Sequence, residues 1–354
     1  MPAFPALKPN PIHHPWTEAP PAGEMTEVAP GVHWLRMALP ISLDHINLWL
    51  IEDGDEWVIV DTGFGTSETC DVWQSVFDGP AKGRKPGRLI CTHHHPDHFG
   101  LAGWLTRTYS IPCLMSEKEW LVGTLLEKMG DDTYVTGQTE FYRRNGVPAD
   151  MCGPLNAIGN AYRTCIFDPP QAFTRLRDKD ELKIGAHVWQ VMMLEGHSEE
   201  LAGLYCPDLR VFIPGDQVLP KITPNISVHW FKDGTEPLSD FLGSLERIAE
   251  SLPSDTLVLP SHKLPFYGLH TRIADIQEHH RDRLQDIKDA LEDGGPQDAW
   301  TLVPAIFPRA IGDEHVMFAL GESIAHLAYL VAQGQVDATV SDGRVLYQLK
   351  VSNT

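Results

Sequence analysis

One short run of residues restricts what this chain can fold into more than any other, Thr92-His93-His94-His95-Pro96-Asp97-His98. It follows the apolar segment Arg88 to Thr92, which predicts a short strand ending in the run. Side chains that alternate along a loop, such as His93 and His95, can aim at one point, and a kink at Pro96 can turn the next two toward a second. Imidazoles and carboxylates that converge within about 2.0–2.2 Å of an ion make a metal site. By itself the run would also fit a histidine-rich turn without metal.

Three further strand ends carry the same kinds of side chain. A histidine or aspartate follows a predicted strand in Glu195-Gly196-His197, in Pro214-Gly215-Asp216 and in Pro260-Ser261-His262. Glycine beside the first two lets the backbone turn sharply. Strand ends are also where the functional side chains of α/β proteins gather. Four such positions together favour one shared metal site over a histidine-rich turn.

The order of these residues resembles that of the metallo-β-lactamase superfamily. Its HxHxDH motif, its later ligands and its short aspartate motif are matched by His93, His95, Asp97, His98, His197, Asp216, His262 and Asp61-Thr62-Gly63. The match extends from about Glu27 to Leu269. What it implies is an α/β fold of the αββα sandwich type, with two packed β-sheets, helices outside them and the site at one edge.

The resemblance also implies how the ligands are divided. His93, His95 and His197 would bind one metal ion, Asp97, His98 and His262 would bind another, and Asp216 would bridge the two. The carboxylate of Asp61 would support the ligands from behind. Asp97 and Asp216 are the two carboxylates that we expect to act in catalysis.

Two metal ions would supply the chemistry of a hydrolase. Ions about 3.5–4 Å apart can share a hydroxide, because coordination lowers the pKa of water from 15.7 to about 7. The predicted nucleophile is this bridging hydroxide, so no serine or cysteine nucleophile is required. Nitrogen and oxygen ligands without thiolate suit two Zn ions, and also Fe or Mn. The sequence therefore predicts an enzyme, a binuclear metal-dependent hydrolase.

The net charge narrows the substrate. The chain has 48 acidic against 28 basic residues, a formal charge of -20, and such a surface repels phosphate backbones and anionic lipid. We therefore expect a small-molecule substrate, and neither nucleic acid nor a membrane as a partner. The leading hypothesis is a small carbonyl ester such as a lactone or thioester. Two alternatives stay open, a phosphodiesterase or ribonuclease and a regulatory binding protein that keeps the metals but turns over little.

Three polar residues outside the ligand set are candidate substrate contacts. His45 and Asn47 begin a predicted strand that faces the expected edge of the site, and His229 follows Asp216 closely in the chain. We expect His94, by contrast, to point away from the metals.

Composition divides the chain into three parts. Residues 1–26 are rich in proline and predict an extended N-terminal arm. Residues 27–269 would form the catalytic domain, and residues 270–354 a small helical, winged-helix-like domain. Within the catalytic domain, residues 116–165 are expected to be helical and interrupt the strand–helix alternation, which predicts an insertion that could serve as a lid.

The C-terminal part resembles the small C-terminal domain found in a subgroup of the superfamily. The residues that carry this resemblance are Trp300 to Phe307 and the predicted helix Met317 to Gln333. A winged helix that grips nucleic acid needs Lys or Arg on one face, and this part has few basic residues. A packing or dimerisation role is therefore favoured, which makes a homodimer an open prediction.

The six cysteines form no CxxC pair, and most lie in apolar surroundings, which is typical of free thiols in a reducing compartment. The chain starts without a cationic segment followed by an apolar one, and it has no apolar run near the roughly 20 residues that cross a bilayer. These observations predict a cytoplasmic protein.

Overall fold

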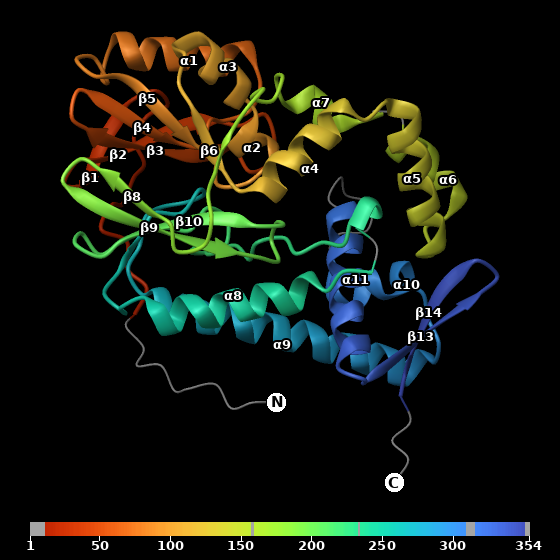
Figure 1. The fold of residues 1–354 in the computed structure, drawn as a ribbon. Coiled ribbons are helices and arrows are strands. Elements are labelled where there is room, and N and C mark those ends of the chain that lie inside the picture. Colours follow the sequence, from red (N-terminus) through yellow and green to blue (C-terminus); the bar gives the residue numbers. More distant parts are fainter. Residues whose placement is uncertain (1–10, 157–158, 233, 309–315, 351–354) are drawn as a thin grey trace. The chain divides into compact units, whose positions relative to one another are not determined.

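The computed structural model describes residues 11–156, 159–232, 234–308 and 316–350 (Figure 1). The first ten residues of the predicted N-terminal arm lie outside this range. The chain forms two compact units. The first consists of Met1–Lys128, Ala161–Pro224 and Leu245–Ile273, and the second of Met129–Asn160, Asn225–Ser244 and Ala274–Thr354.

Two mixed β-sheets build the first unit. The seven-stranded sheet has the order β1 (Met25–Ala29), β2 (Val32–Ala38), β3 (His45–Asp53), β4 (Glu56–Val60), β5 (Lys85–Ile90), β6 (Cys113–Met115) and β7 (Thr174–Arg175). The five-stranded sheet has the order β12 (Leu257–Val258), β11 (Val211–Ile213), β10 (Leu201–Cys206), β9 (His187–Leu194) and β8 (Glu181–Ile184). Strands β1 to β4 pair antiparallel, whereas β4 to β7 pair parallel.

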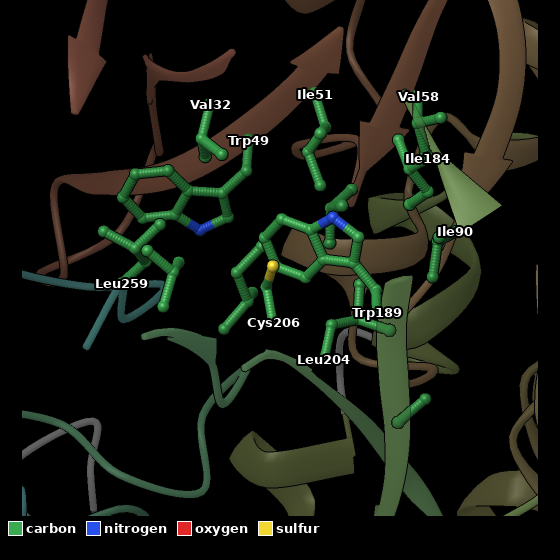
Figure 2. Packing of buried hydrophobic residues seen from close by; sticks show 14 of the residues in the cluster. Val32, Trp49, Ile51, Val58, Ile90, Ile184, Trp189, Leu204, Cys206 and Leu259 are labelled. Atoms are coloured by element: carbon green, nitrogen blue, oxygen red, sulfur yellow. The ribbon is translucent and has the colours of Figure 1, made fainter. Parts of the chain in front are cut away.

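Alternating apolar side chains explain why the two sheets pack together. In β3, Trp49 and Ile51 belong to one buried cluster, whereas Leu48 and Leu50 belong to another. Successive side chains of a strand point to opposite faces of the sheet, so each face of this strand is apolar. The first cluster also takes residues from the other sheet, among them Trp189, and Figure 2 shows the indoles of Trp49 and Trp189 in this cluster. This is the predicted sandwich.

Helices cover the outer faces. The second apolar cluster joins the seven-stranded sheet to α1 (Ser67–Asp78) and α3 (Ala102–Tyr109), through residues such as Trp73 and Leu105. On the five-stranded sheet, Arg247 of α8 (Pro237–Ser251) donates a hydrogen bond to the carbonyl of Met193 in β9. The αββα order predicted from the sequence is confirmed.

Strand direction gathers the loops that matter for the site. Strands β4 and β5 are parallel, and β9, β11 and β12 share one direction, because β10 is antiparallel to both of its neighbours while β12 is parallel to β11. The loops after β4 and β5 therefore leave one sheet at the same edge, and the loops after β9, β11 and β12 leave the other sheet at the same edge. One hydrogen bond, from the amide of Ala202 to the carbonyl of Thr92 (2.9 Å), joins the two sheets there.

The second unit is mainly helical. It contains α5 (Asp131–Arg144), α6 (Ala149–Asn156), α10 (Ala299–Ile306), α11 (Val316–Ala332), most of α9 (Leu269–Gly294), the short 3-10 helix η1 (Trp230–Lys232) and the hairpin β13 (Val336–Ser341) and β14 (Arg344–Leu349). The hairpin turns at Asp342 and Gly343, both with positive φ, as a two-residue turn of this kind requires. The predicted order of helix, helix and hairpin is confirmed, and the C-terminal part is a small helical and β domain.

The predicted insertion, residues 116–165, is helical but not one piece. Its ends, α4 (Glu117–Lys128) and α7 (Ala161–Cys165), belong to the first unit, and its middle, α5 and α6, belongs to the second. The ends are held in the first unit by buried polar anchors described below. Whether the middle moves as a lid stays a prediction, as do the domain boundaries.

All six cysteines are free. Among the described residues, no helix is both long enough and apolar enough to cross a membrane.

Candidate metal centre

The histidine-rich run forms the turn from β5 into the one-turn helix α2 (Pro96–Phe99). Proline suits the first position of a helix, because its fixed φ fits and its missing N–H would have no partner there. The amide of His98 then bonds to the carbonyl of His95 (3.0 Å). The kink predicted at Pro96 is thus the start of a helical turn that carries Asp97 and His98.

His93, His95 and His197 come together as one group. One potential ligand atom from each lies within 4.8 Å of the others. Nε2 of His93 and Nδ1 of His95 face each other at 2.9 Å. These are the three residues that the sequence assigned to the first metal ion.

Asp97, His98 and His262 form a second group of the same size. Oδ2 of Asp97 lies 3.5 Å from Nε2 of His98 and 3.3 Å from Nε2 of His262. Two ligands at about 2.0–2.1 Å from a tetrahedral ion are about 3.3–3.4 Å apart, so the spacing suits a shared cation. These residues match the set predicted for the second ion.

Asp216 lies between the two groups. Its Oδ2 is 3.6 Å from Nε2 of His197 and 3.4 Å from Nε2 of His262, and its Oδ1 is 3.5 Å from Nε2 of His98. Gly215 makes this placement possible, because its φ is +56° and an added Cβ would lie 3.1–3.3 Å from Leu201 and Thr92. The position is that of the predicted bridging ligand.

Unpaired atoms test whether metal ions fit. Nε2 of His98, Nε2 of His262 and Oδ1 of Asp216 are buried and have no hydrogen-bond partner among the described residues. Their nearest imidazoles and carboxylates in the cluster lie 3.3–3.5 Å away, which is longer than a normal hydrogen bond and leaves room for an ion between them. Three such atoms converge on one place, and all are metal-ligand types. The donor set therefore fits two divalent cations, and it contains no group that would select one metal.

The two ligand groups differ in charge: the first consists of imidazoles, and the second, with Asp97, His98 and His262, contains a carboxylate. Burial, followed by the neighbouring imidazoles, holds the pKa of His93 and His95 well below the usual value, so both are neutral and suited to bind metal. Burial alone would also lower the pKa of His262, but the Asp216 and Asp97 carboxylates raise it to about 10. The surroundings of Asp97, His98 and His262 are therefore anionic and attract positive charge. Either a proton or a metal ion can supply that charge.

Asp61 supports the second ligand group from behind. Its Oδ2 accepts hydrogen bonds from Nδ1 of His98 (2.8 Å) and the hydroxyl of Thr92 (2.9 Å), and its Oδ1 accepts the amide of Thr92 (2.7 Å). Such a carboxylate fixes the ring orientation and makes the other nitrogen a better ligand. Asp61 holds a φ of +64°, a region that asparagine and aspartate tolerate best among side-chain-bearing residues.

Replacing Asp61 with asparagine is expected to weaken metal binding or activity by about 10–100-fold, the usual effect of losing a partner behind a metal ligand. Asparagine keeps the shape and tolerates the positive φ, so the loss reports the carboxylate charge on His98. Metal affinity from chelator competition checks it, with Asp55→Asn in the exposed turn after β3 as the control. Equal affinities of the two variants would remove Asp61 from the site.

Glu119 is a site residue that sequence reasoning missed. It is fully buried in α4, and its Oε2 accepts hydrogen bonds from the amide of His94 (2.9 Å) and from Nδ1 of the same residue (2.5 Å). Its Oε1 accepts the amide of Glu200 (2.7 Å). One carboxylate therefore ties the loop of His93–His98 to the loop that carries His197. His94 points to Glu119 and belongs to neither ligand group, as predicted.

The loop of His93–His98, which Glu119 anchors, has a second anchor. The hydroxyl of Tyr162 in α7 donates to the carbonyl of His94 (2.6 Å). The anchoring role of Glu119 could not be predicted from the sequence. Glu119 is one of many acidic residues in the chain, and no spacing to another motif distinguishes it.

His45 and Asn47 contact the loop that carries His262, and the substrate contact predicted for them stays a prediction. Nε2 of His45 accepts the amide of Lys263 (2.8 Å), its Nδ1 faces Asp44, and its carbonyl accepts Nδ1 of His262 (2.8 Å). Nδ2 of Asn47 donates to the carbonyls of Pro260 and Lys263. Both side chains are buried with these groups engaged, so they position the loop of His262. Sequence reasoning placed the strand correctly, but it could not predict this positioning role, because the loop beside the strand is distant in the chain.

His229 belongs to the second unit. There its ring stacks on Phe231, with centroids 5.5 Å apart, and it lines a cavity of about 190 Å³ with aromatic residues of α5. Its contact with substrate stays a prediction.

Comparison with known proteins agrees with this site. Residues 41–290 match the metallo-beta-lactamase superfamily, and residues 284–350 match the metallo-beta-lactamase-like C-terminal domain. Among curated proteins, the chain is 24% identical over 323 residues to "Probable metallo-hydrolase YqjP" of Bacillus subtilis (strain 168), which covers 88% of this chain and 96% of that protein. It is 25% identical over 244 residues to the human acyl-coenzyme A thioesterase MBLAC2, covering 66% and 78%.

Two solved structures share the fold along nearly the whole chain. A beta-lactamase domain protein from Burkholderia ambifaria is 36% identical with a TM-score of 0.84, and the match covers 96% of this chain and 99% of that one. A metallo-beta-lactamase family protein from Thermus thermophilus is 26% identical with a TM-score of 0.76, covering 92% and 100%. Both matches extend through the C-terminal part, so that part accompanies the sandwich in these relatives.

Proposed function

The chain belongs to the metallo-β-lactamase superfamily and is a metal-dependent hydrolase, and from this premise we propose that it hydrolyses a small carbonyl ester, a thioester or a lactone. The site residues would hold two divalent cations, one on each histidine group, with Asp216 shared. We propose Zn for both, with Fe or Mn as the metals that the same ligands also suit.

The observation that carries the choice of substrate is the charge of the chain. A net charge of -20 opposes the approach of a polyanion such as nucleic acid. The relative MBLAC2 is named an acyl-coenzyme A thioesterase, which supports a thioester carbonyl as the group attacked. An ester carbonyl needs no negative charge on the substrate, so it agrees with an acidic protein better than a phosphodiester does.

Bound in this cluster, two divalent cations would supply Lewis acidity and a water activated for attack near neutral pH. The protein's part is to hold and orient. Asp61 fixes the ring of His98, Glu119 fixes the loops of the first histidine group, and His45 and Asn47 fix the loop of His262.

Asp97 is placed to move a proton. Its side chain is 15% exposed, against 11% for Asp216. Burial, the largest effect, raises its pKa, but the charges of His98 and His262 outweigh burial and lower the pKa below the usual value. The carboxylate is therefore ionised at neutral pH. Its Oδ2 faces the two imidazoles, so Oδ1 would take the proton that the attacking water gives up and return it to the leaving sulfur or oxygen as the bond from the carbonyl carbon to that atom breaks.

A matched substrate panel tests this proposal. The metal-loaded protein is given one acyl group as its coenzyme A thioester and as its uncharged N-acetylcysteamine thioester, together with lactones and a phosphodiester. We expect turnover of the thioesters or lactones, with kcat/KM for the uncharged thioester at least equal to that for the charged one. Turnover of the phosphodiester alone would overturn the proposal. Metal bound without turnover of any substrate would favour the regulatory alternative.

A further inference from the structure

A second group of metal-ligand side chains lies in the second unit. Glu322 and His326 are four residues apart on α11, so they share one face of that helix. His280 reaches the same place from α9. One nitrogen or carboxylate oxygen from each of the three lies within 4.8 Å of the others, and all three residues are buried. None of them belongs to the cluster around Asp216.

Hydrogen bonds fix which nitrogens face the centre of this group. Nδ1 of His326 donates to the carbonyl of Glu322 (2.7 Å), so its Nε2 carries a lone pair. That Nε2 faces Nδ1 of His280 at 3.1 Å. Nε2 of His280 is buried and has no hydrogen-bond partner among the described residues. One nitrogen of the His280 ring therefore contacts His326, and the other has no hydrogen-bond partner among the described residues. The ring of Phe241 packs edge-on against the His280 ring, with centroids 5.6 Å apart.

The carboxyl group of Glu322 is similarly enclosed. Nδ2 of Asn225 donates to its Oε2 (3.2 Å). Arg283, a cation on α9 whose charge acts on Glu322, is itself paired with Asp286 (3.0 Å). Buried ionisable groups without a direct charge partner are rare, because burying an uncompensated charge costs several kcal/mol.

We propose that His280, Glu322 and His326 bind a divalent transition metal ion, most suitably Zn²⁺, as a third metal site separate from the catalytic pair. Two imidazoles and one carboxylate are an established zinc ligand set. The ion would replace the proton between Nδ1 of His280 and Nε2 of His326, with the other nitrogen of His280 then carrying the proton of that ring, and their 3.1 Å separation is close to the roughly 3.3 Å expected for two ligands of a tetrahedral ion. Because the group is buried between α9 and α11, the ion would act as a structural link between these helices.

The charge of Glu322 is consistent with this assignment. Burial, only partly opposed by the hydrogen bond from Asn225, raises the pKa of Glu322 to about 8, so without a cation the group is neutral at pH 7. A divalent ion would compensate the carboxylate charge. Glutamine at position 322 is then a near-isosteric substitute for the metal-free form, and the fold is expected to tolerate it.

Metal stoichiometry of the full-length protein tests the site without relying on activity. Four proteins are loaded with Zn²⁺, freed of excess ion by gel filtration and analysed for bound zinc, namely the wild type, His280→Leu, Glu322→Gln and His279→Leu. His279 is a stringent control, because its ring packs against that of His280 with centroids 5.5 Å apart, so replacing it disturbs the packing beside the group without removing a ligand. We expect three equivalents in the wild type and His279→Leu and two in the other variants, and Co²⁺ loading should show the same difference in its visible absorption.

Equal metal content in His279→Leu, His280→Leu and Glu322→Gln would overturn the proposal and leave a hydrogen-bonded histidine pair. If His280→Leu does not fold, Glu322→Gln decides by itself. Because only differences between variants are read, incomplete filling of the catalytic centre changes neither outcome.

Discussion

Replacing Asp216 with alanine is expected to remove hydrolysis almost entirely, with kcat/KM lower by at least about 1000-fold, which corresponds to about 4 kcal/mol in the barrier. Asp216 lies within 3.6 Å of a histidine nitrogen from each group. Its removal takes one anionic ligand from both predicted ions at once. Loss of a residue behind a ligand costs 10–100-fold, so loss of a shared ligand should cost more.

The measurement is zinc content together with steady-state hydrolysis of the best substrate from the panel. The amount of bound metal should fall along with activity, because the variant lacks one of the carboxylates that attract cations to the group of Asp97, His98 and His262. Asp71→Ala, on the exposed side of α1, is the control that should change neither. Full metal content and full activity in Asp216→Ala would refute the assignment of the whole centre.

The second large effect is on stability, and it concerns Glu119→Gln. The carboxylate of Glu119 accepts three hydrogen bonds while fully buried. Glutamine has one acceptor oxygen and would turn its NH₂ group toward a backbone N–H. Burial, the largest effect, raises the pKa of Glu119, but the charge and hydrogen bond of His94 and the amides of Glu200 and His94 lower it from 4.5 to about 2. That shift corresponds to roughly 3 kcal/mol.

The free energy of unfolding should therefore fall by roughly 3 kcal/mol in Glu119→Gln, or about 6–12 °C in the melting temperature of the unit that contains it. Because the pKa is lower in the folded protein than in the unfolded chain, this stabilisation is fully present above pH 4.5 and is lost as the pH falls toward 2. The gap between wild type and variant should thus narrow in acid. Thermal unfolding of the metal-free proteins at pH 7 and near pH 3 measures both effects, because histidine ligands release their ions in acid and would otherwise confound the comparison.

Glu117→Gln is the matched control for this experiment. It makes the same chemical change two residues earlier in α4, where the side chain is 46% exposed and pairs with Arg175 on the surface. Exposed pairs contribute about 0–1 kcal/mol, so its melting temperature should stay close to that of the wild type. Equal melting temperatures for Glu119→Gln and Glu117→Gln would show that the carboxylate of Glu119 does not hold the two loops.

The sequence located the metal-type side chains that the structure brings together, because their signal is local. Each metal-type side chain follows a strand that apolar alternation identifies, and the HxHxDH spacing places four of them within six residues. The sandwich was implied by the family resemblance, and in the structure residues such as Trp49 and Leu50 face opposite apolar clusters, as a strand buried on both faces requires. The helical C-terminal part and its Asp342-Gly343 turn were predicted for equally local reasons.

Supporting residues were harder to predict, because their partners are distant in the chain. His45 pairs with Lys263, and Glu119 bonds to Glu200. A buried histidine and a buried glutamate have the same letters as their exposed counterparts, so only the packing shows which hydrogen bonds they make. The group of His280, Glu322 and His326 is similar, since its members are 46 residues apart at the widest pair.

By itself the sequence determined the histidine-rich run at the end of β5, the other strand ends that carry His197, Asp216 and His262, and the α/β class of the fold. Those features depend on spacing and on apolar periodicity, which are written along the chain. The tertiary structure alone decided that Glu119 joins the loop of His93–His98 to the loop of His197, and that residues 116–165 are shared by two units. The physical reason is that contacts between segments distant in the chain determine which side chains are buried and which hydrogen bonds they make. No local sequence pattern predicts those contacts.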